Sequence, residues 1–209
     1  NPSTVDHISQ IRQAVQQGRL DATIKVNASP VASSQFMVFN WNKASDPFKQ
    51  SLFRSDKFRR AMSHLVNRQA VIDIVYGGLG TPMYSSVYPV LTQWINPKVP
   101  KYEYDPKQAA KLLAELGFTK KDREGYLVDS KGRRIEFNLA TNAGNTQREQ
   151  IAKLIVDEAK KVGVKVNFQA IDFNTLVGQL LSSGPDRPFD AIIIGGGAAV
   201  IQFARVGPH

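Results

Sequence analysis

The sequence predicts an α/β fold centred on a strand–helix–strand–helix–strand unit between Ile135 and Gly197. Apolar and polar residues alternate in Ile135–Thr141 and again in Val164–Ile171, as in strands covered mainly on one face. Between them, Gln147–Val162 carries apolar residues at helical spacing. Phe189–Ile194 is a short apolar run, typical of a parallel strand covered on both faces. We therefore expect these three strands in one sheet, joined by helical crossovers.

Turn-forming and capping residues separate these elements. Asn142–Asn145 can turn the chain and cap the first crossover helix, and Gly163 suits the end of that helix. Asp172 can cap a second crossover helix over Phe173–Leu181, which Ser182–Pro185 would end. Open α/β sheets bind ligands at the carboxyl ends of their parallel strands, so we expect any ligand there.

The N-terminal part predicts a helix and two strands. Val5–Gln17 has apolar residues at helical spacing, and Leu20–Val26 suggests a short strand. Ala28–Ser34 contains a proline and predicts a loop. Gln35–Asn42 predicts a strong strand because aromatic and β-branched residues dominate it.

The next part predicts helices between irregular segments. Lys43–Arg54 is polar and contains a proline, which indicates a loop. Ser55–Leu65 and Arg68–Tyr76 predict two helices, with Asn67 as the break and cap between them. Gly77–Tyr104 is rich in glycine, proline and tyrosine, which predicts an ordered loop laid over the body.

One further helix and a hairpin complete the prediction. Asp105 followed by Pro106 is a strong helix start, an N-cap with proline at the first helical position. Leu112 and Leu113 lie on the apolar face of this helix, and we expect both to be buried. Phe118–Arg134 predicts a hairpin that leads into the first core strand.

Composition narrows the class of protein. The 209 residues are 42% hydrophobic and 22% charged, as in ordinary globular proteins, and they include no cysteine. The absence of cysteine excludes a disulfide scaffold and thiolate metal sites. The formal charge of +9 comes from scattered Lys and Arg, which favours a solvated basic surface over a nucleic-acid partner. No apolar stretch is long enough to span a bilayer, and Asn1-Pro-Ser-Thr reads as a mature N-terminus rather than a signal peptide.

The sequence offers little for catalysis, and we expect neither enzyme activity nor a cofactor. The histidines are scattered at His7, His64 and His209, and no hydrolase, zinc-protease or metal-ligand spacing occurs. A hydrolase or transferase lobe of α/β type stays open as the alternative, but the strand ends supply only Asp172 and Asp190 as titratable groups. A regulator's effector-binding lobe should carry a helix-turn-helix, which the sequence lacks.

Several motifs, in order, point to one known family. They are the helix pair Phe58–Ile72, which is similar to the family pattern R-x-A…R-x-x-I, the glycine loop Gly77–Pro82, the Y-D-P segment Tyr104–Phe118, and the short segments Gln147–Ala152, Val162–Val164 and Phe189–Asp190. These resemble the motifs of family 5 extracellular solute-binding proteins, the peptide, nickel and oligosaccharide receptors of bacterial ABC importers. The resemblance runs from about Ala14 to Gly195, most of the chain.

The resemblance implies one lobe of a type II periplasmic-binding-protein fold, because full-length members are much longer. Such a receptor would close two lobes on a small-molecule or oligopeptide ligand and deliver it to an ABC permease in the membrane. It implies a periplasmic or extracellular location, with any membrane anchor in a part absent here. We expect a single lobe over residues 1–209, and its uncovered face could self-associate. Its regions would be a lead-in (1–34), a hinge-near strand with helices and loop (35–134), the βαβαβ core (135–197) and an atypical tail (198–209).

The candidate ligand-binding residues lie at the expected strand ends and in two aromatic positions. They are Thr141, Asn142, Asp172, Gly195, Gly196, Gly197, Tyr84 and Trp41. Each has a structural interpretation beside the functional one. Helix capping is favoured for Asp172, and anchoring of the loop is slightly favoured for Tyr84. For the glycines, close approach by a ligand and by another segment remain equally open, and Trp41 carries the same ambiguity as Tyr84.

The end of the sequence departs from the family pattern. Peptide-binding members follow the last strand with Gly-Trp and, three residues on, an aspartate that neutralises the peptide's amino group. Gly196 and Ala199 stand at those places here, and Val200–His209 does not resemble the family. Either the solute is not a peptide with a free amino group, or the tail is altered. The glycine run at 195–197 also lacks the last small residue of a dinucleotide fingerprint, so no nucleotide site is expected.

Overall fold

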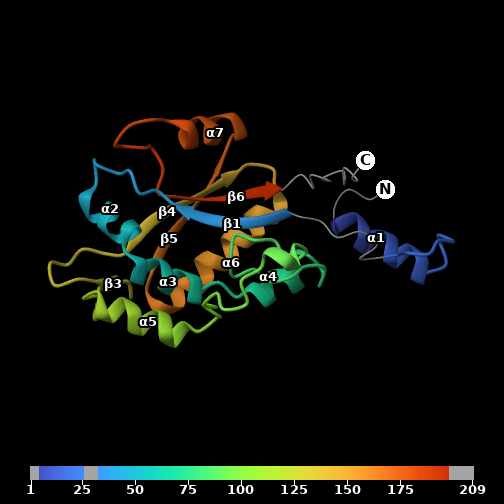
Figure 1. The fold of residues 1–209 in the computed structure, drawn as a ribbon, viewed down its shortest axis with the longest axis horizontal. Helices are drawn as coiled ribbons and strands as arrows, with labels where there is room; N and C mark the ends of the chain where they lie inside the picture. The colour runs from blue at the N-terminus through green and yellow to red at the C-terminus, as the bar shows by residue number, and fades with distance from the viewer. Residues whose placement is uncertain (1–4, 26–32, 198–209) are drawn as a thin grey trace, which may run out of the picture.

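The computed structural model describes residues 5–25 and 33–197, which form a mixed α/β structure around one four-stranded sheet (Figure 1). The strand order is β1-β6-β4-β5, and the strands are β1 (Ser33–Phe39), β4 (Glu136–Asn142), β5 (Lys165–Ile171) and β6 (Ala191–Gly197). β4 runs parallel to both β5 and β6, while β1 runs antiparallel to β6. The prediction that the three core strands share one sheet is therefore confirmed.

The two predicted crossover helices are also confirmed. α6 (Thr146–Val162) joins β4 to β5, and α7 (Phe173–Leu181) joins β5 to β6. α6 starts where the Asn145 side chain accepts a hydrogen bond from the Arg148 N–H at 3.0 Å. It ends at Gly163, whose φ of 93° lies in the left-handed region that favours glycine. A Cβ at this position would also lie 3.0 Å from the Gly125 carbonyl oxygen, so the close approach needs a glycine.

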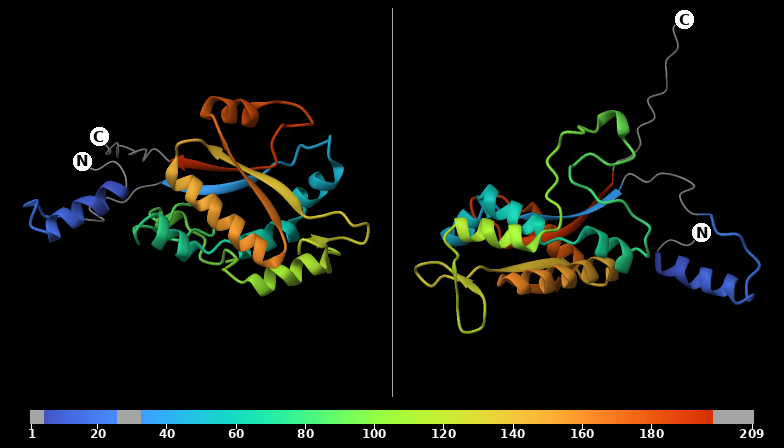
Figure 2. Two further views of the ribbon diagram at one scale, coloured as in Figure 1. Left: turned by 180° about the vertical axis from the view of Figure 1, so that it is seen from behind. Right: turned by 90° about the horizontal axis from the view of Figure 1, so that it is seen from below.

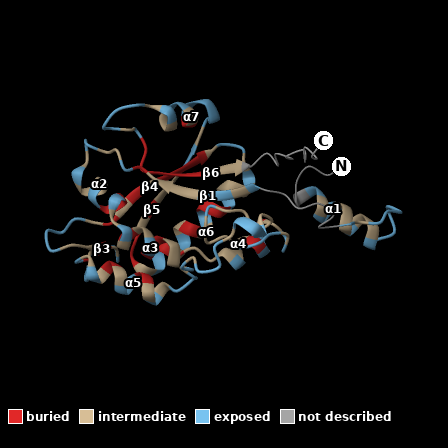
Figure 3. Cartoon of the chain, in the orientation of Figure 1, coloured by how far each residue is buried: buried red, intermediate tan, exposed pale blue. Residues whose placement is uncertain are grey.

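The remaining helices cover the sheet unequally, as Figures 1 and 2 show. α6 lies on one face together with α3 (Asp56–His64), α4 (Arg68–Val75) and α5 (Pro106–Glu115), whereas α7 covers the other face. Figure 3 shows the buried residues concentrated in the sheet and on the helix sides that face it. The larger core therefore lies under α6 and its neighbours, and a smaller one lies under α7.

Four phenylalanine rings form the centre of the larger core. Their centroids lie 5.3 to 6.2 Å apart, in tilted and edge-to-face arrangements that suit aromatic quadrupoles. The four are Phe39 of β1, Phe53, Phe58 of α3 and Phe137 of β4. Residues far apart in the sequence thus meet at the middle of the sheet face.

Two peripheral parts agree with the sequence. β2 (Lys120–Lys121) and β3 (Leu127–Val128) pair antiparallel as the predicted hairpin. α1 (Val5–Gln16) is the predicted first helix; it stands apart from the sheet in Figures 1 and 2 and contributes no residue to either described core. The long loop at 77–104 contains one short 3-10 helix, Thr92–Trp94, and no other regular element.

The loop predicted over Lys43–Arg54 is correct for Lys43–Asp46 and wrong for Pro47–Arg54, which form α2. Asp46 is its N-cap and accepts a hydrogen bond from the Lys49 N–H at 3.0 Å. Proline lacks only an N–H that the first turn of a helix cannot use, so Pro47 starts this helix instead of preventing one.

The strand predicted at 20–26 is wrong over its described residues, because Leu20–Lys25 pairs with no other segment. Val26 and most of the loop predicted at 28–34 lie outside the described residues, as does the tail at 198–209. Ser33 and Ser34 belong to β1 and not to that loop, and β1 ends at Phe39, short of the predicted Asn42.

The predicted burial of the α5 face is correct for Leu113 and only partly correct for Leu112. Leu113 is fully buried, whereas Leu112 is half-buried at the edge of the larger core. Leu112→Ala is therefore expected to cost about 1–2 kcal/mol of unfolding free energy, below the 2–5 kcal/mol typical of a buried leucine. Urea unfolding of both variants checks this, and a larger loss for Leu112→Ala than for Leu113→Ala would contradict it.

Candidate functional site

The parallel strands β4, β5 and β6 end at one edge of the sheet, where most candidate residues lie. β4 and β6 pair only through Leu139–Ala191 and Ala140–Ile192, whereas β6 pairs with β1 along its whole length. Beyond Ala140 the two strands are linked by the fully buried Thr141, whose hydroxyl donates to the Ile193 carbonyl at 3.1 Å. Because this hydroxyl is already used in a hydrogen bond between β4 and β6, Thr141 stabilises the strand ends and is not free to bind a ligand.

Arg148 bridges this edge from the first turn of α6. Its Nη1 donates to Asn142 Oδ1 at 2.8 Å, at the end of β4. Its Nε donates to Gln35 Oε1 at 2.9 Å, on β1. Since β6 lies between β4 and β1 in the sheet, the guanidinium crosses over the end of β6.

Gly195 provides the space for that guanidinium. A Cβ at Gly195 would lie 2.3 Å from Arg148 Nη2 and 3.1 Å from Gln35 Oε1. Any side chain at this position would therefore displace the arginine. Of the two interpretations left open for this glycine, close approach by another segment is the one that the contacts support.

The electrostatics of the bridge are unusual because the cation has neutral partners. Arg148 forms no ion pair with any residue in the described ranges. Burial lowers the pKa of Arg148, and the neighbouring Tyr76 counters that effect. Arginine nevertheless stays charged in proteins, so a positive charge remains at the strand ends.

Two tyrosines approach the same edge. The Tyr76 hydroxyl is buried beside Gln35 without a hydrogen bond of full geometry to any described residue, and burial raises its pKa. The Tyr88 hydroxyl lies 3.4 Å from where a Cβ of Gly196 would be, and Phe36 of β1 lies 3.3 Å from that point. The edge thus combines a guanidinium, two amides and two hydroxyl groups.

Tyr84 is held elsewhere in the loop, against Arg68. The Arg68 guanidinium lies 4.6 Å from the centroid of the Tyr84 ring and also donates to the carbonyls of Met83 and Tyr102. These bonds tie both ends of the loop to α4. The contacts agree with loop anchoring, the interpretation that the sequence slightly favoured.

The other candidates divide between the two edges of the sheet. Asp172 is exposed and caps α7, accepting from the Thr175 N–H at 3.1 Å, which agrees with the favoured interpretation. Gly196 and Gly197 extend β6 and pair with Ser34 and Ser33. Trp41 lies at the opposite edge, because it follows the end of β1, which runs antiparallel to β6; Arg59 stacks on its ring at 4.7 Å. The structure therefore does not bring Trp41 together with the strand-end residues.

Three residues at this edge were missing from the sequence-based candidates. They are Gln35, Tyr76 and Arg148. One signal was available for Arg148, since a cation in the first turn of a helix opposes the helix dipole and is a poor choice for stability. Nothing in the sequence places Gln35, 113 positions away, beside it.

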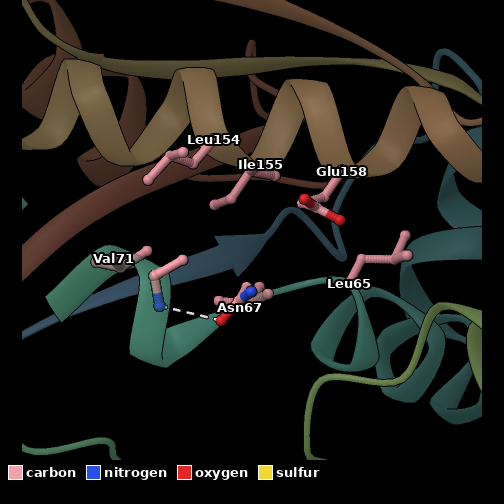
Figure 4. Close-up of a pocket in the computed structure, with 8 residues that line it drawn as sticks. Leu65, Asn67, Val71, Leu154, Ile155 and Glu158 are labelled. Atoms are coloured by element: carbon pink, nitrogen blue, oxygen red, sulfur yellow. Dashed lines mark hydrogen bonds between the residues drawn. The ribbon is translucent and has the colours of Figure 1, made fainter. Parts of the chain in front are cut away.

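Two small cavities lie away from this edge. The first, of about 20 Å³, lies between α4 and α6 and is lined mostly by apolar side chains (Figure 4). The second, of about 80 Å³, is lined by polar and apolar groups around Asp190, at the start of β6. Pockets for small molecules usually measure about 300–1,000 Å³, so neither cavity fits a solute.

In the described part of the chain, no group of three or more His, Cys, Asp or Glu side chains is placed to hold a metal ion. None of the helices in the ranges 5–25 and 33–197 has the length and apolarity that a membrane crossing requires.

Comparison with known proteins decides the family. Residues 4–204 match the family described as "Bacterial extracellular solute-binding proteins, family 5 Middle". The chain belongs to this family. The resemblance noted in the sequence from about Ala14 to Gly195 is thereby confirmed, and the match continues to residue 204, into the tail that was expected to depart from the family.

Curated relatives of this family 5 chain are named as binding proteins. A "Probable ABC transporter-binding protein" of Deinococcus radiodurans is 51% identical over 198 residues, which are 93% of this chain and 33% of that protein. "Oligopeptide-binding protein AppA" of Bacillus subtilis is 34% identical over 163 residues, 77% of this chain and 28% of that protein. The family 5 chain therefore spans a third or less of the length of these relatives.

Solved structures agree with the expected fold. Bacillus subtilis AppA in complex with a nonapeptide superposes with a TM-score of 0.71 at 29% identity, over 88% of this chain and 35% of that one. Lactococcal OppA in its closed conformation gives 0.68 at 23% identity, over 92% and 39%, and supports the fold alone. The mixed α/β structure thus matches part of the periplasmic-binding-protein fold, and the partial coverage fits one lobe, as predicted.

Proposed function

We propose that this chain is one lobe of the solute-binding component of a bacterial ABC importer. The parent receptor would capture a solute between two lobes and deliver it to the membrane permease. Family membership over residues 4–204 carries this proposal, and the coverage of a third or less of the relatives supports a single lobe. Relatives are named for binding oligopeptides and heme, so a peptide-like solute or another small molecule is the class to test.

The strand-end edge would be this lobe's wall of the solute site. Asn142, Gly195 and Gly196 lie there, with Arg148 over Gly195 on one face of β6 and Tyr88 beside Gly196 on the other. Backbone and side-chain polar groups at such an edge can bind a solute without chemistry on it. The relatives are binding proteins and not enzymes, which supports a non-catalytic role here, and their class supports a periplasmic or extracellular location.

The test is solute binding by the full-length receptor that contains this chain. Calorimetric titration with mixed oligopeptides and with oligosaccharides should give saturable binding. Small-angle X-ray scattering should show a smaller radius of gyration in the bound state, because the lobes close. Turnover of the added peptide or sugar, or the absence of both binding and closure, would refute the proposal.

The isolated 209-residue chain is expected to bind neither peptides nor sugars tightly. A closing receptor gains affinity by burying most of the solute surface, and one lobe supplies only one wall. A loss of a few kcal/mol follows, at about a factor of ten in Kd for each 1.4 kcal/mol. Titration alongside sedimentation checks this and also tests the expected self-association of the uncovered face. Sub-micromolar binding by a monomer would contradict the one-lobe assignment.

A further inference from the structure

The guanidinium of Arg148 is a positive charge that lacks a negative partner among the described residues. The neighbouring electrostatic environment contains Tyr76 but no acid close enough to raise the pKa of this group. Glu149, its neighbour in the helix, accepts instead from the Gly144 N–H at 2.9 Å. Asp172 is occupied as the cap of α7.

Other arginines of the chain have the partners that a guanidinium usually has in a folded protein, either an acid or several carbonyl groups. Arg134 pairs with Asp122 at 2.6 Å, and this acid raises the pKa of Arg134. Arg60 pairs with Asp56 at 2.6 Å. Arg68 has no acid, but it donates to three backbone carbonyls and stacks on a tyrosine, which makes it a structural anchor.

The contacts of Arg148 differ, because they fix the orientation of the guanidinium and leave some of its N–H donors without an acceptor among the described residues. Gln35 and Asn142 accept from Nε and Nη1, and Nη2 forms no hydrogen bond with the described residues. A guanidinium has five N–H donors in a rigid fork, so at least three remain for a further acceptor. Two neutral amides thus orient the group without neutralising it.

We propose that Arg148 binds an anionic group of the solute, a carboxylate in a peptide-like ligand. The proposal rests on the function proposed above and assigns the charge that the solute must carry. The absence of a side chain at Gly195 leaves room for the guanidinium to lie across the end of β6, and the Tyr76 hydroxyl is a neighbouring donor. A carboxylate matches the geometry of the fork, since arginine binds it through two parallel N–H bonds.

An acidic side chain from the rest of the parent receptor could offer the same chemistry. In that case Arg148 would form an ion pair between the two lobes and would not contact the solute. The two sources differ in one measurable respect. A solute carboxylate makes binding depend on the charge of the solute, whereas an acid of the protein weakens the binding of charged and neutral solutes equally when Arg148 is removed.

The experiment uses the full-length receptor and a tryptic digest of casein as the probe, both intact and with its carboxylates methyl-esterified. Retention of each peptide on immobilised receptor is measured by mass spectrometry. The best-retained peptide is then titrated calorimetrically as the acid and as the ester. The variants are Arg148→Gln and Arg148→Lys, and the control is Arg123→Gln, which removes an equal charge from the exposed turn of the β2–β3 hairpin.

The unaltered receptor is expected to bind the acid about 10- to 100-fold more tightly than the ester, the range for a charge-assisted hydrogen bond. Arg148→Gln should abolish this preference, Arg148→Lys should retain part of it, and Arg123→Gln should retain all of it. Equal binding of acid and ester by the unaltered receptor would overturn the Arg148 assignment and leave the proposed function intact. Equal weakening of acid and ester by Arg148→Gln would overturn it in favour of the contact between lobes.

A second variant tests the role of Gly195 independently. Gly195→Ala must displace the guanidinium, while its backbone does not require glycine. It should reduce the preference for the acid, and adding Arg148→Gln should cause no further loss, because both changes remove the same interaction. Fully additive losses would show that Gly195 and Arg148 act separately. Retention of neither acid nor ester would refute a peptide solute, and with it both this inference and the peptide form of the proposed function.

Discussion

Phe137→Ala is expected to lower the free energy of unfolding by about 3–5 kcal/mol. Phe137 is 1% exposed, and its ring contacts the other three phenylalanines of the larger core. Truncation removes the ring's transfer free energy and leaves a cavity where β1, β4 and α3 meet. Domains are commonly stable by about 5–15 kcal/mol, so this one change could remove much of the total.

Denaturant unfolding followed by circular dichroism measures the effect. Phe137→Leu keeps most of the volume and should cost about 1–2 kcal/mol, so it supplies a value even where the alanine variant fails to fold. Phe173→Ala is the control, since that ring is 57% exposed and its loss should stay within about 0.5 kcal/mol. A cost below about 1 kcal/mol for Phe137→Ala would contradict the assigned core.

Asp190→Asn is expected to cost about 3 kcal/mol near neutral pH, as does breaking a buried ion pair. Asp190 is 3% exposed at the start of β6, where Lys43 and Lys49 approach it at 2.9 and 2.8 Å. It also accepts from the Asn138 N–H at 2.9 Å. The amide cannot neutralise two ammonium groups, which are themselves only partly exposed to solvent.

The pH dependence of the same group has a defined sign. Burial opposes ionisation of Asp190, but the Asn138 N–H and the ammonium groups of Lys49 and Lys43 outweigh it and lower the pKa. The folded-state pKa thus lies below the unfolded value of about 3.9, so the stabilisation is complete above that value. It is lost as the pH falls through the folded-state pKa. Unfolding curves for the native chain and Asp190→Asn should therefore converge in acid, and a constant difference from pH 7 to pH 2 would contradict this account.

Local patterns in the sequence predicted the core well, because neighbouring residues determine those elements. The alternation in β4 and β5, the spacing in α6 and the cap at Asp172 all depend on positions a few residues apart. The same local logic failed at Leu20–Lys25, where a predicted strand is absent, and at Pro47, where polarity and a proline suggested a loop. Asp46 before that proline was the overlooked sign of a helix start.

The candidate site could be predicted only in part, because tertiary contacts build it. The strand ends followed from the topology of parallel sheets, which correctly gathered Asn142 and Gly195. Arg148 owes its position to an amide on β1 and to a missing side chain on β6. No local sequence pattern predicts the direction of β1 either. Because β1 runs antiparallel to β6, Trp41 lies at the opposite end of the strands.

The position of β6 in the sheet determines when the chain can fold during synthesis. β6 is the last of the four strands to leave the ribosome, yet it lies in the interior of the sheet, between β1 and β4. Until Ala191–Gly197 emerge, β1 has no partner in the sheet, and the nascent chain must hold that aromatic strand unpaired. Pairs such as Phe39 with Ala191 then close a loop of about 150 residues, and contacts so distant in sequence slow folding. Nascent chains that stop before β6 should therefore be a natural target for chaperones that bind exposed apolar strands.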